Sequence, residues 1–273
     1  MSDAPRPSLW RRLAHDLAVA WMLLRHGLTP TSILLFPVRR RLAQPFTRLD
    51  HRDGTVFVAG HDDDLCLLVQ EVWIERCYET ATHRIPAGGA IVDIGANVGA
   101  FALWAARHRP NCTLICVEPS PRALDHLRAN LARNTVRDAT IIAGACGQPG
   151  RATLWAGERS SGDTLKPLDG DRTRPLAEVE VLDLDQVLAR SAHSGPVWLK
   201  LDCEGAERDI IEHASDAALG RVTGMALEFH AERAGCTLDE MCGLLERRGF
   251  EVERVIRQEG RMAAGDYLFA GRR

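Results

Sequence analysis

The sequence AIVDIGANVGAFALWAARH, residues 90–108, joins a short apolar run to a helical segment through a glycine-containing turn. The apolar run is typical of a strand that is buried on both faces of a parallel sheet. Gly95 and Gly99 bracket the turn, and such turns let a ligand approach the backbone N–H groups at the start of the next helix. These residues therefore predict a strand, a ligand-binding turn and a helix in succession.

The same alternation continues along the chain. The apolar runs CTLICVEP, ATIIAGA, VWLKLDC and VTGMALEFH follow in that order, separated by helical segments such as PRALDHLRANLARN and AERDIIEHA. This pattern favours an α/β fold with a doubly wound, mostly parallel sheet. A loop-rich insert is expected after ATIIAGA, and FEVERVIRQ with DYLFAGRR predicts a terminal antiparallel strand pair. Upstream, TVFVAG predicts a short strand and residues 65–81 a helix.

The composition restricts the class of protein. The chain has 273 residues, 45% of them hydrophobic, and a net charge of −3, so it is large enough for one substantial core and we expect no nucleic-acid partner. Its eight cysteines form no CxxC pair, and no signal peptide is apparent. These features predict reduced thiols in a cytoplasmic protein with no bound metal. Only two of the 34 basic residues are lysine, which suggests an arginine-favouring bacterial genome.

The first 52 residues differ in charge from the rest and are predicted to form a basic amphipathic extension ahead of a domain at 53–273. They hold nine arginines against three aspartates. Residues 9–25 predict a helix that has one apolar face, made of Trp10, Leu13, Leu17, Trp21 and Leu24. Its uncharged stretch, 17–24, is far shorter than the roughly 20 residues of a spanning helix. Packing on the core is favoured; peripheral membrane contact and a lid on the acceptor cleft are the alternatives.

The turn at Gly95 also indicates which nucleotide the site holds. A dinucleotide fingerprint needs a middle glycine to make room for pyrophosphate, and this turn reads GANVG. Asp93 would repel a pyrophosphate but suits a cationic group. Glu118 ends the next strand about 20 residues further on, where a carboxylate can bind both ribose hydroxyls. A nicotinamide-dependent oxidoreductase is therefore disfavoured, though it stays open as an alternative.

Residues 90–230 resemble the FkbM-type methyltransferases, a group of class I S-adenosylmethionine-dependent enzymes. The resemblance rests on VDIGANVG, VEPSP, VEVLDLDQVL, WLKLDCEGAE and ALEFH, in that order. It implies a Rossmann-like sheet of seven strands, S-adenosylmethionine as cofactor and O-methylation of a hydroxyl. By position it implies that the cofactor binds Asp93, Gly95, Asn97, Gly99 and Glu118, with Ala145 near the adenine.

The stretch KLDCEGAE, residues 200–207, places four charged residues at the end of a predicted buried strand. A hydroxyl acceptor needs a general base, and the candidates are Asp202, Glu204 and His230. Lys200 shares the strand face of Asp202, where it would pair with a carboxylate or polarise the acceptor oxygen. Glu207 falls in the first turn of the next helix, so we expect it to be structural.

An alternative is a divalent cation that acidifies the hydroxyl, bound by Asp202, Glu204, Glu228 and His230. The favoured function is methyl transfer to a hydroxyl of a glycan, lipid-linked sugar or secondary metabolite. A catalytically silent, S-adenosylmethionine-binding scaffold is the remaining alternative. The polar segment 157–175, GERSSGDTLKPLDGDRTRP, is the predicted acceptor-facing loop.

Overall fold

The computed structural model describes residues 9–41, 47–60, 63, 65–170, 172–256 and 266–273. Its centre is a seven-stranded sheet in the order β11-β12-β10-β9-β3-β4-β5. The strands are β3 (Ala90–Ile94), β4 (Thr113–Glu118), β5 (Ala139–Ala143), β9 (Val197–Leu201), β10 (Val222–Phe229), β11 (Phe250–Ile256) and β12 (Asp266–Arg272). Neighbours from β10 to β5 pair in parallel, while β12 runs antiparallel to both β10 and β11. The predicted Rossmann-like α/β fold is confirmed.

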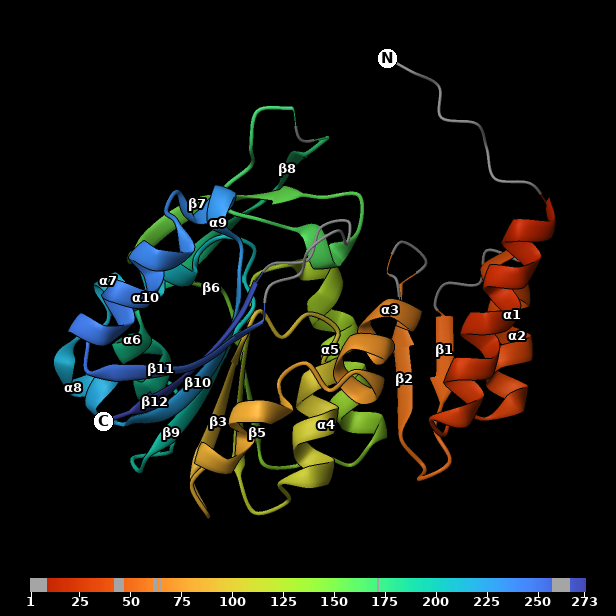
Figure 1. Cartoon of the computed structure of the whole chain (residues 1–273), viewed down its shortest axis with the longest axis horizontal. Coiled ribbons are helices and arrows are strands. Elements are labelled where there is room, and N and C mark those ends of the chain that lie inside the picture. Colours follow the sequence, from red (N-terminus) through yellow and green to blue (C-terminus); the bar gives the residue numbers. More distant parts are fainter. Residues whose placement is uncertain (1–8, 42–46, 61–62, 64, 171, 257–265) are drawn as a thin grey trace.

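Helices cover both faces of this sheet (Figure 1). On one face lie α4 (Ala100–His108) and α5 (Pro121–Arg133); on the other lie α6 (Leu184–Ala189), α7 (Glu207–His213), α8 (Asp216–Gly220), α9 (Ala231–Ala234) and α10 (Leu238–Arg247). Strand residues alternate between the two resulting cores: Val92 and Ile94 pack in one, and Ile91 in the other. Because both faces are buried, the strands read as continuous apolar runs rather than as an alternating pattern.

The order of the strands determines where a ligand can bind. From the central strand β3, the chain continues to β4 and β5 on one side, while β9 lies on its other side. The connections therefore diverge at β3, and they leave a crevice at the carboxyl ends of β3, β4 and β9. Open α/β sheets bind their ligands in this position.

The segment after β5 contains a second sheet, where the sequence predicted only a loop-rich insert. It consists of β6 (Ala145–Cys146), β8 (Arg174–Leu182) and β7 (Gly150–Ala156), in that order. In β7 and β8, apolar residues alternate with polar ones, so that one face packs on a small core including Leu154 and Val179. That half-polar pattern is typical of antiparallel strands with one solvated face, and it lacks the apolar runs of the main sheet.

Residues 65–81 do not form the single helix that was predicted. They begin as α3 (Leu65–Val69), widen into the π-helical turn η1 (Gln70–Ile74), and resume as the 3-10 helix η2 (Glu79–Arg84). The break contains Arg76, whose φ of 54° is left-handed. It places Tyr78 in the interior, where its hydroxyl reaches two carboxylates. These buried hydrogen bonds favour the interruption over a continuous helix.

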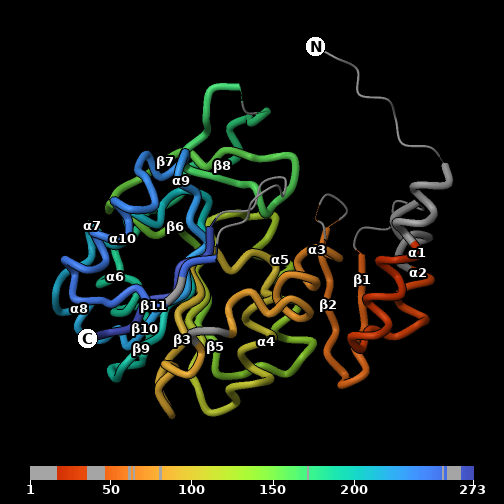
Figure 2. Tube along the Cα trace, in the orientation of Figure 1, coloured from red at the N-terminus to blue at the C-terminus, as the bar shows by residue number. Residues whose placement is uncertain are grey.

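The N-terminal region is a helical hairpin followed by a β-hairpin. The helices are α1 (Leu9–Arg25) and α2 (Pro30–Arg41), and β1 (Thr47–Asp50) pairs antiparallel with β2 (Val56–Ala59). Residue 52, the predicted domain boundary, lies in the turn between these two paired strands. Figure 2 shows the part of these helices that is drawn in red at the end of the molecule opposite α8 and the C-terminus.

The β-hairpin is attached to the main domain by side chains of α5. The amides of Asn130 and Asn134 each accept from and donate to the backbone of β2, at Val58 and Val56, over 2.7–2.8 Å. Two asparagines thus replace the missing strand partner along this edge. Within the described residues, no helix has the length and apolar character needed to cross a membrane.

Candidate active site

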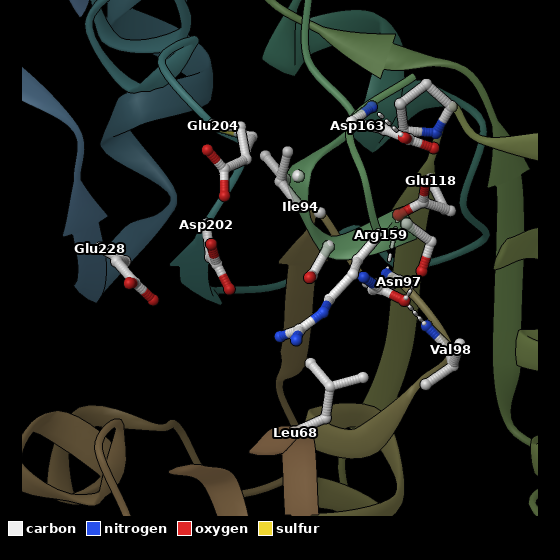
Figure 3. Close-up of a pocket in the computed structure, with 18 of the residues that line it drawn as sticks. Leu68, Ile94, Asn97, Val98, Glu118, Arg159, Asp163, Asp202, Glu204 and Glu228 are labelled. Carbon is white, nitrogen blue, oxygen red and sulfur yellow. Dashed lines mark hydrogen bonds between the residues drawn. The ribbon is translucent and has the colours of Figure 1, made fainter. Parts of the chain in front are cut away.

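A cavity of about 690 Å³ opens at the carboxyl ends of β3, β4 and β9. Its volume is within the range of about 300–1,000 Å³ that is usual for ligand sites. Residues from α3, η1 and the segment 157–173 form its other walls. Figure 3 shows Glu118 and Asn97 on one side of it and Asp202, Glu204 and Glu228 on the other. After the roles that the sequence predicted for these residues, we call these the cofactor side and the acceptor side.

The glycine turn allows the ends of β3 and β9 to approach each other. Gly95 has a φ of +79°, and a Cβ at this position would lie 1.7 Å from the backbone oxygen of Asp202. Gly99 has a φ of +87° and faces Leu127 of α5, whose Cδ1 would lie 2.7 Å from an added Cβ. Gly95 is therefore required by the close approach of the Asp202 backbone, and the left-handed φ favours glycine at both positions. Gly95 lines the cavity, and Gly99 lies behind it.

Glu118 is a buried carboxylate that faces the cavity, and it is held by two backbone amides. Its Oε2 accepts from the N–H of Asn97 and its Oε1 from the N–H of Ser120, each at 2.7 Å. Burial raises the pKa of Glu118 to about 7. Each oxygen keeps a further lone pair for a ligand hydroxyl. The geometry fits the predicted contact with ribose. Ala145, which was predicted to lie near the adenine, lines the same cavity.

Lys200 connects the two sides beneath the cavity. Its Nζ lies 3.2 Å from Asp93 Oδ1 and 3.1 Å from Asp202 Oδ2, and it donates to the carbonyl of Gly95 at 2.9 Å. Burial opposes the charge of Lys200, but the two carboxylates raise its pKa. Burial also raises the pKa of Asp93, which is not among the lining residues. Asp93 is therefore paired with Lys200 and lies outside the cavity lining, where the sequence predicted a cofactor contact.

Two tyrosines complete the acceptor side. The Tyr78 hydroxyl lies 3.0 Å from Asp202 Oδ2 and 3.1 Å from Glu228 Oε2, and the Tyr267 hydroxyl donates to the same Glu228 oxygen at 3.1 Å. Burial opposes ionisation of Asp202, but Lys200 and His230 lower its pKa. Neither tyrosine was predicted as a site residue from the sequence. Their rarity was the available signal, because the chain has only two.

Glu204, which follows β9, and His230, which follows β10, form a charged cluster. Glu204 has a left-handed φ of 53° and lines the cavity. Burial raises the pKa of Glu204 to about 7, although the charge of His230 acts to lower it. His230 lies behind Glu204, with Nε2 3.8 Å from Glu204 Oε1 and Nδ1 3.2 Å from Glu207 Oε1. Despite burial, Glu207 and the neighbouring carboxylates raise the pKa of His230 to about 10.

Glu207 supports the loop that carries Glu204. Its side chain is fully buried, and its Oε1 accepts from the N–H groups of Cys203 at 3.3 Å and Gly205 at 3.1 Å. These contacts agree with the expected structural role. Within the described residues, no group of three or more His, Cys, Asp or Glu side chains is arranged to hold a metal ion, and all eight cysteines are free thiols.

The insert folds over the cofactor side. Ser160 Oγ lies 3.2 Å from Asn97 Oδ1 and also contacts Asp63. Asp163 accepts from Ser120 Oγ at 2.7 Å and from Arg122 Nε at 3.0 Å. The first residues of the predicted acceptor-facing loop therefore cover the glycine turn. Arg159 of this loop lines the cavity and extends into it in Figure 3.

Residues 93–252 match the Methyltransferase FkbM domain. The chain belongs to this family. This FkbM-family protein is 28% identical to the 31-O-demethyl-FK506 methyltransferase FkbM of Streptomyces tacrolimicus, over 75% of this chain and 85% of that one. It is also 28% identical to the AMB antimetabolite synthetase AmbE of Pseudomonas aeruginosa, over 72% of this chain but only 11% of AmbE.

Solved structures with a similar arrangement include M. jannaschii TYW2 in complex with AdoMet, with a TM-score of 0.45 and 11% identity over 83% of this chain and 85% of that one. Magnesium protoporphyrin IX methyltransferase from Synechocystis, with bound SAM, has a TM-score of 0.41 and 13% identity over 67% and 69%. The family membership establishes an S-adenosylmethionine-dependent methyltransferase, in place of the nicotinamide-dependent oxidoreductase that the sequence had left open.

Proposed function

We propose that this chain is an O-methyltransferase that acts on a hydroxyl of a glycan, lipid-linked sugar or secondary metabolite, with Glu204 as the general base. One observation carries the proposal: the carboxyls of Glu204 and Asp202 both line the cavity at the end of β9, next to the glycine turn. The name of the relative FkbM, which covers 75% of this chain, states methylation of 31-O-demethyl-FK506. That name supports an oxygen acceptor.

S-adenosylmethionine supplies an electrophilic methyl group on its sulfonium. A hydroxyl is a poor nucleophile until its proton leaves, and a base with a pKa near the working pH removes that proton most efficiently. Glu204, with a pKa raised to about 7 by burial, meets this condition and receives the proton on its carboxylate. Asp202, with its lowered pKa, remains ionised and is the weaker base.

His230 has a different role from that of the general base for which it was a candidate. Its pKa of about 10 keeps the ring protonated at neutral pH, so it has no free lone pair to accept a proton. The imidazolium lies between Glu204 and Glu207. There it balances their charge and fixes the orientation of Glu204, which makes it a positioning residue.

Lys200 is the second positioning residue. Its ammonium bonds the carbonyl of Gly95 and pairs with Asp202, so it ties the cofactor turn to the acceptor strand. Orientation of this kind contributes strongly to displacement reactions, because small errors in the approach of the two reactants raise the barrier. We therefore expect Lys200→Met to disturb cofactor binding and turnover together.

The test is methyl transfer by the full chain. Purified protein is incubated with S-adenosylmethionine carrying a labelled methyl group and a panel of sugars, lipid-linked sugars and hydroxylated secondary metabolites. The expected product gains one methyl group on oxygen, identified by mass spectrometry and NMR. Glu232→Gln, a change at an exposed carboxylate of α9, serves as the matched control for Glu204→Gln. Cofactor binding by calorimetry with no transfer to any acceptor would favour the silent scaffold instead.

A further inference from the structure

The two N-terminal helices carry an unusual concentration of exposed apolar side chains. Six large hydrophobic residues are exposed within the described part of the chain, and four belong to α1 and α2: Leu17 at 70%, Trp21 at 61%, Leu34 at 71% and Leu35 at 44%. The other two, Leu67 and Val255, are each 38% exposed. Single exposed leucines are ordinary on a protein surface, but a cluster that includes a tryptophan marks an interaction site.

The helix α1 is attached to the domain by a different face. Val19, Met22 and Leu23 pack against the core, whereas Leu17 and Trp21, one helical turn apart, face solvent. Leu17 and Trp21 belong to the apolar face of residues 9–25, which was predicted from the sequence to pack on the core. Because one apolar face of α1 is buried and the other is exposed, the exposed face is available to a partner.

The charge of the same helices identifies the chemistry of that partner. Their sequences contain six arginines and one aspartate, and the guanidinium of Arg25 lies 5.3 Å from the centre of the Trp21 ring. Residues 1–52 carry nine arginines against three aspartates, although the whole chain has a net charge of −3. Six of these arginines therefore belong to the same two helices as four of the exposed apolar side chains.

We propose that the α1–α2 hairpin docks on the surface of an anionic lipid bilayer. Leucine and tryptophan side chains would enter the boundary between headgroups and acyl chains, and arginines would pair with lipid phosphates. A second copy of this chain is the less suitable occupant, because a symmetric contact would bring two arginine-rich helix pairs together. The hairpin lies at one end of the molecule (Figure 1), so the main sheet need not change shape on docking. This proposal goes beyond the proposed function and does not depend on it.

The experiment is flotation of the full chain with vesicles of phosphatidylcholine alone or mixed with phosphatidylglycerol. We expect binding to the mixed vesicles, and at least about tenfold weaker binding in about 1 M salt than in about 0.1 M, because salt shortens the range of charge attraction. The double variant Leu17→Ser/Trp21→Ser should lower the vesicle partition coefficient by at least about tenfold. Val255→Ser, which changes an exposed apolar residue of β11, should bind as the wild type does.

The controls separate docking from folding and from self-association. Melting temperature and cofactor affinity should be the same in both variants and the wild type, since the altered side chains are exposed. Equal binding to neutral and anionic vesicles, or no binding by the wild type, would overturn the proposal. So would a wild type that sediments as a dimer without lipid while the double variant sediments as a monomer, because the hairpin would then be a homodimer contact.

Discussion

The two sides of the cavity are built by different means. On the cofactor side, backbone groups of the two turns that follow β3 and β4 hold the buried carboxylate: the N–H groups of Asn97 and Ser120 bind Glu118. On the acceptor side, ionised and phenolic side chains from separate elements hold one another, as Tyr78 and Tyr267 do at Glu228. The carboxylate of the first side is held by backbone N–H groups, whereas the carboxylates of the second side are held by other side chains.

This difference suggests what each side is suited to do. A backbone turn presents fixed N–H groups, and it is insensitive to substitution of most neighbouring side chains, so it suits a cofactor that never changes. A network of buried charges shifts the pKa of every member. It suits a reaction that must accept and release a proton. Changes on the acceptor side should therefore act on turnover, and changes on the cofactor side on affinity.

The largest expected effect is that of Glu204→Gln. Removal of the base should lower turnover by about 10²–10⁴-fold, with cofactor affinity within about twofold of the wild type, as measured by steady-state kinetics and calorimetry. In the wild type, kcat/KM should rise with pH through about 7, because deprotonation of Glu204 activates the base. The variant should lack this rise. Loss of cofactor affinity without loss of turnover would reverse the assignment of the two sides.

On the cofactor side, Glu118→Ala should act on affinity. Loss of its carboxylate should weaken S-adenosylmethionine binding by about 1.5–3 kcal/mol, the usual contribution of hydrogen bonds to a charged group. Calorimetry measures this directly. Asp125→Asn, on an exposed carboxylate of α5, is the control and should bind normally. An affinity within about twofold of wild type for Glu118→Ala would remove Glu118 from the cofactor site.

His230 tests whether the acceptor-side network is held by charge. Its pKa is raised from 6.5 to about 10, so its contribution to stability is complete below pH 6.5 and is lost as pH rises through 10. His230→Gln should lower the free energy of unfolding at pH 7 by about 2 kcal/mol, a discounted value for a shift of this size. Denaturant titrations should show wild type and variant converging above pH 10, whereas His26→Gln should match the wild type throughout.

The close approach of the two sides is tested by a matched pair of glycines. Gly95 and Gly54 both have positive φ, +79° and +93°, but only Gly95 has an atom within 4 Å of an added Cβ. Both changes to alanine incur the left-handed backbone strain, of about 1–2 kcal/mol. Gly95→Ala should cost about 1–3 kcal/mol more in unfolding free energy because of overpacking against Asp202. Equal costs would show that the turn can move away from β9.

The smallest expected effect is that of Tyr78→Phe. The variant removes one hydroxyl and keeps the packed ring, so it should lose about 1 kcal/mol of stability. Without this donor, the pKa of Asp202 should move upward, because the hydrogen bond from Tyr78 helps to lower it. NMR titration of the Asp202 carboxyl measures that change. A pKa unchanged from the wild type would show that Tyr78 donates to Glu228 alone.

The fold and the cofactor side were predictable because their signals are local. Buried parallel strands produce continuous apolar runs, and the glycine turn and Glu118 occur at recognisable spacing. The prediction of one helix over 65–81 was wrong. The π-helical turn and the break bring Tyr78 to Asp202, which is 124 residues further along the chain, and no local pattern indicates this contact. The strands of the insert were missed because their polar faces interrupt the apolar pattern.

The roles within KLDCEGAE were only partly predictable for the same reason. Lys200 was expected to pair with a carboxylate, and it lies close to both Asp93 and Asp202. Its spacing from Asp202 gave no indication of the contact with Asp93, which lies on the neighbouring strand. For His230, the ordinary pKa of 6.5 favoured a base, while the three carboxylates that raise it come from two separate segments. Sequence spacing cannot report such convergence.

The placement of both tyrosines on Glu228 has a consequence for spectroscopy. Burial, with neighbouring carboxylates, raises the pKa of each phenol well above its usual value. The folded protein should therefore show no tyrosinate absorption at a pH where an ordinary exposed tyrosine has already ionised. Because the chain contains no other tyrosine, every change in phenol absorption originates at the acceptor side. Tyrosinate absorption near pH 10, the ordinary pKa of a phenol, would thus report the exposure of these two buried rings without any attached dye.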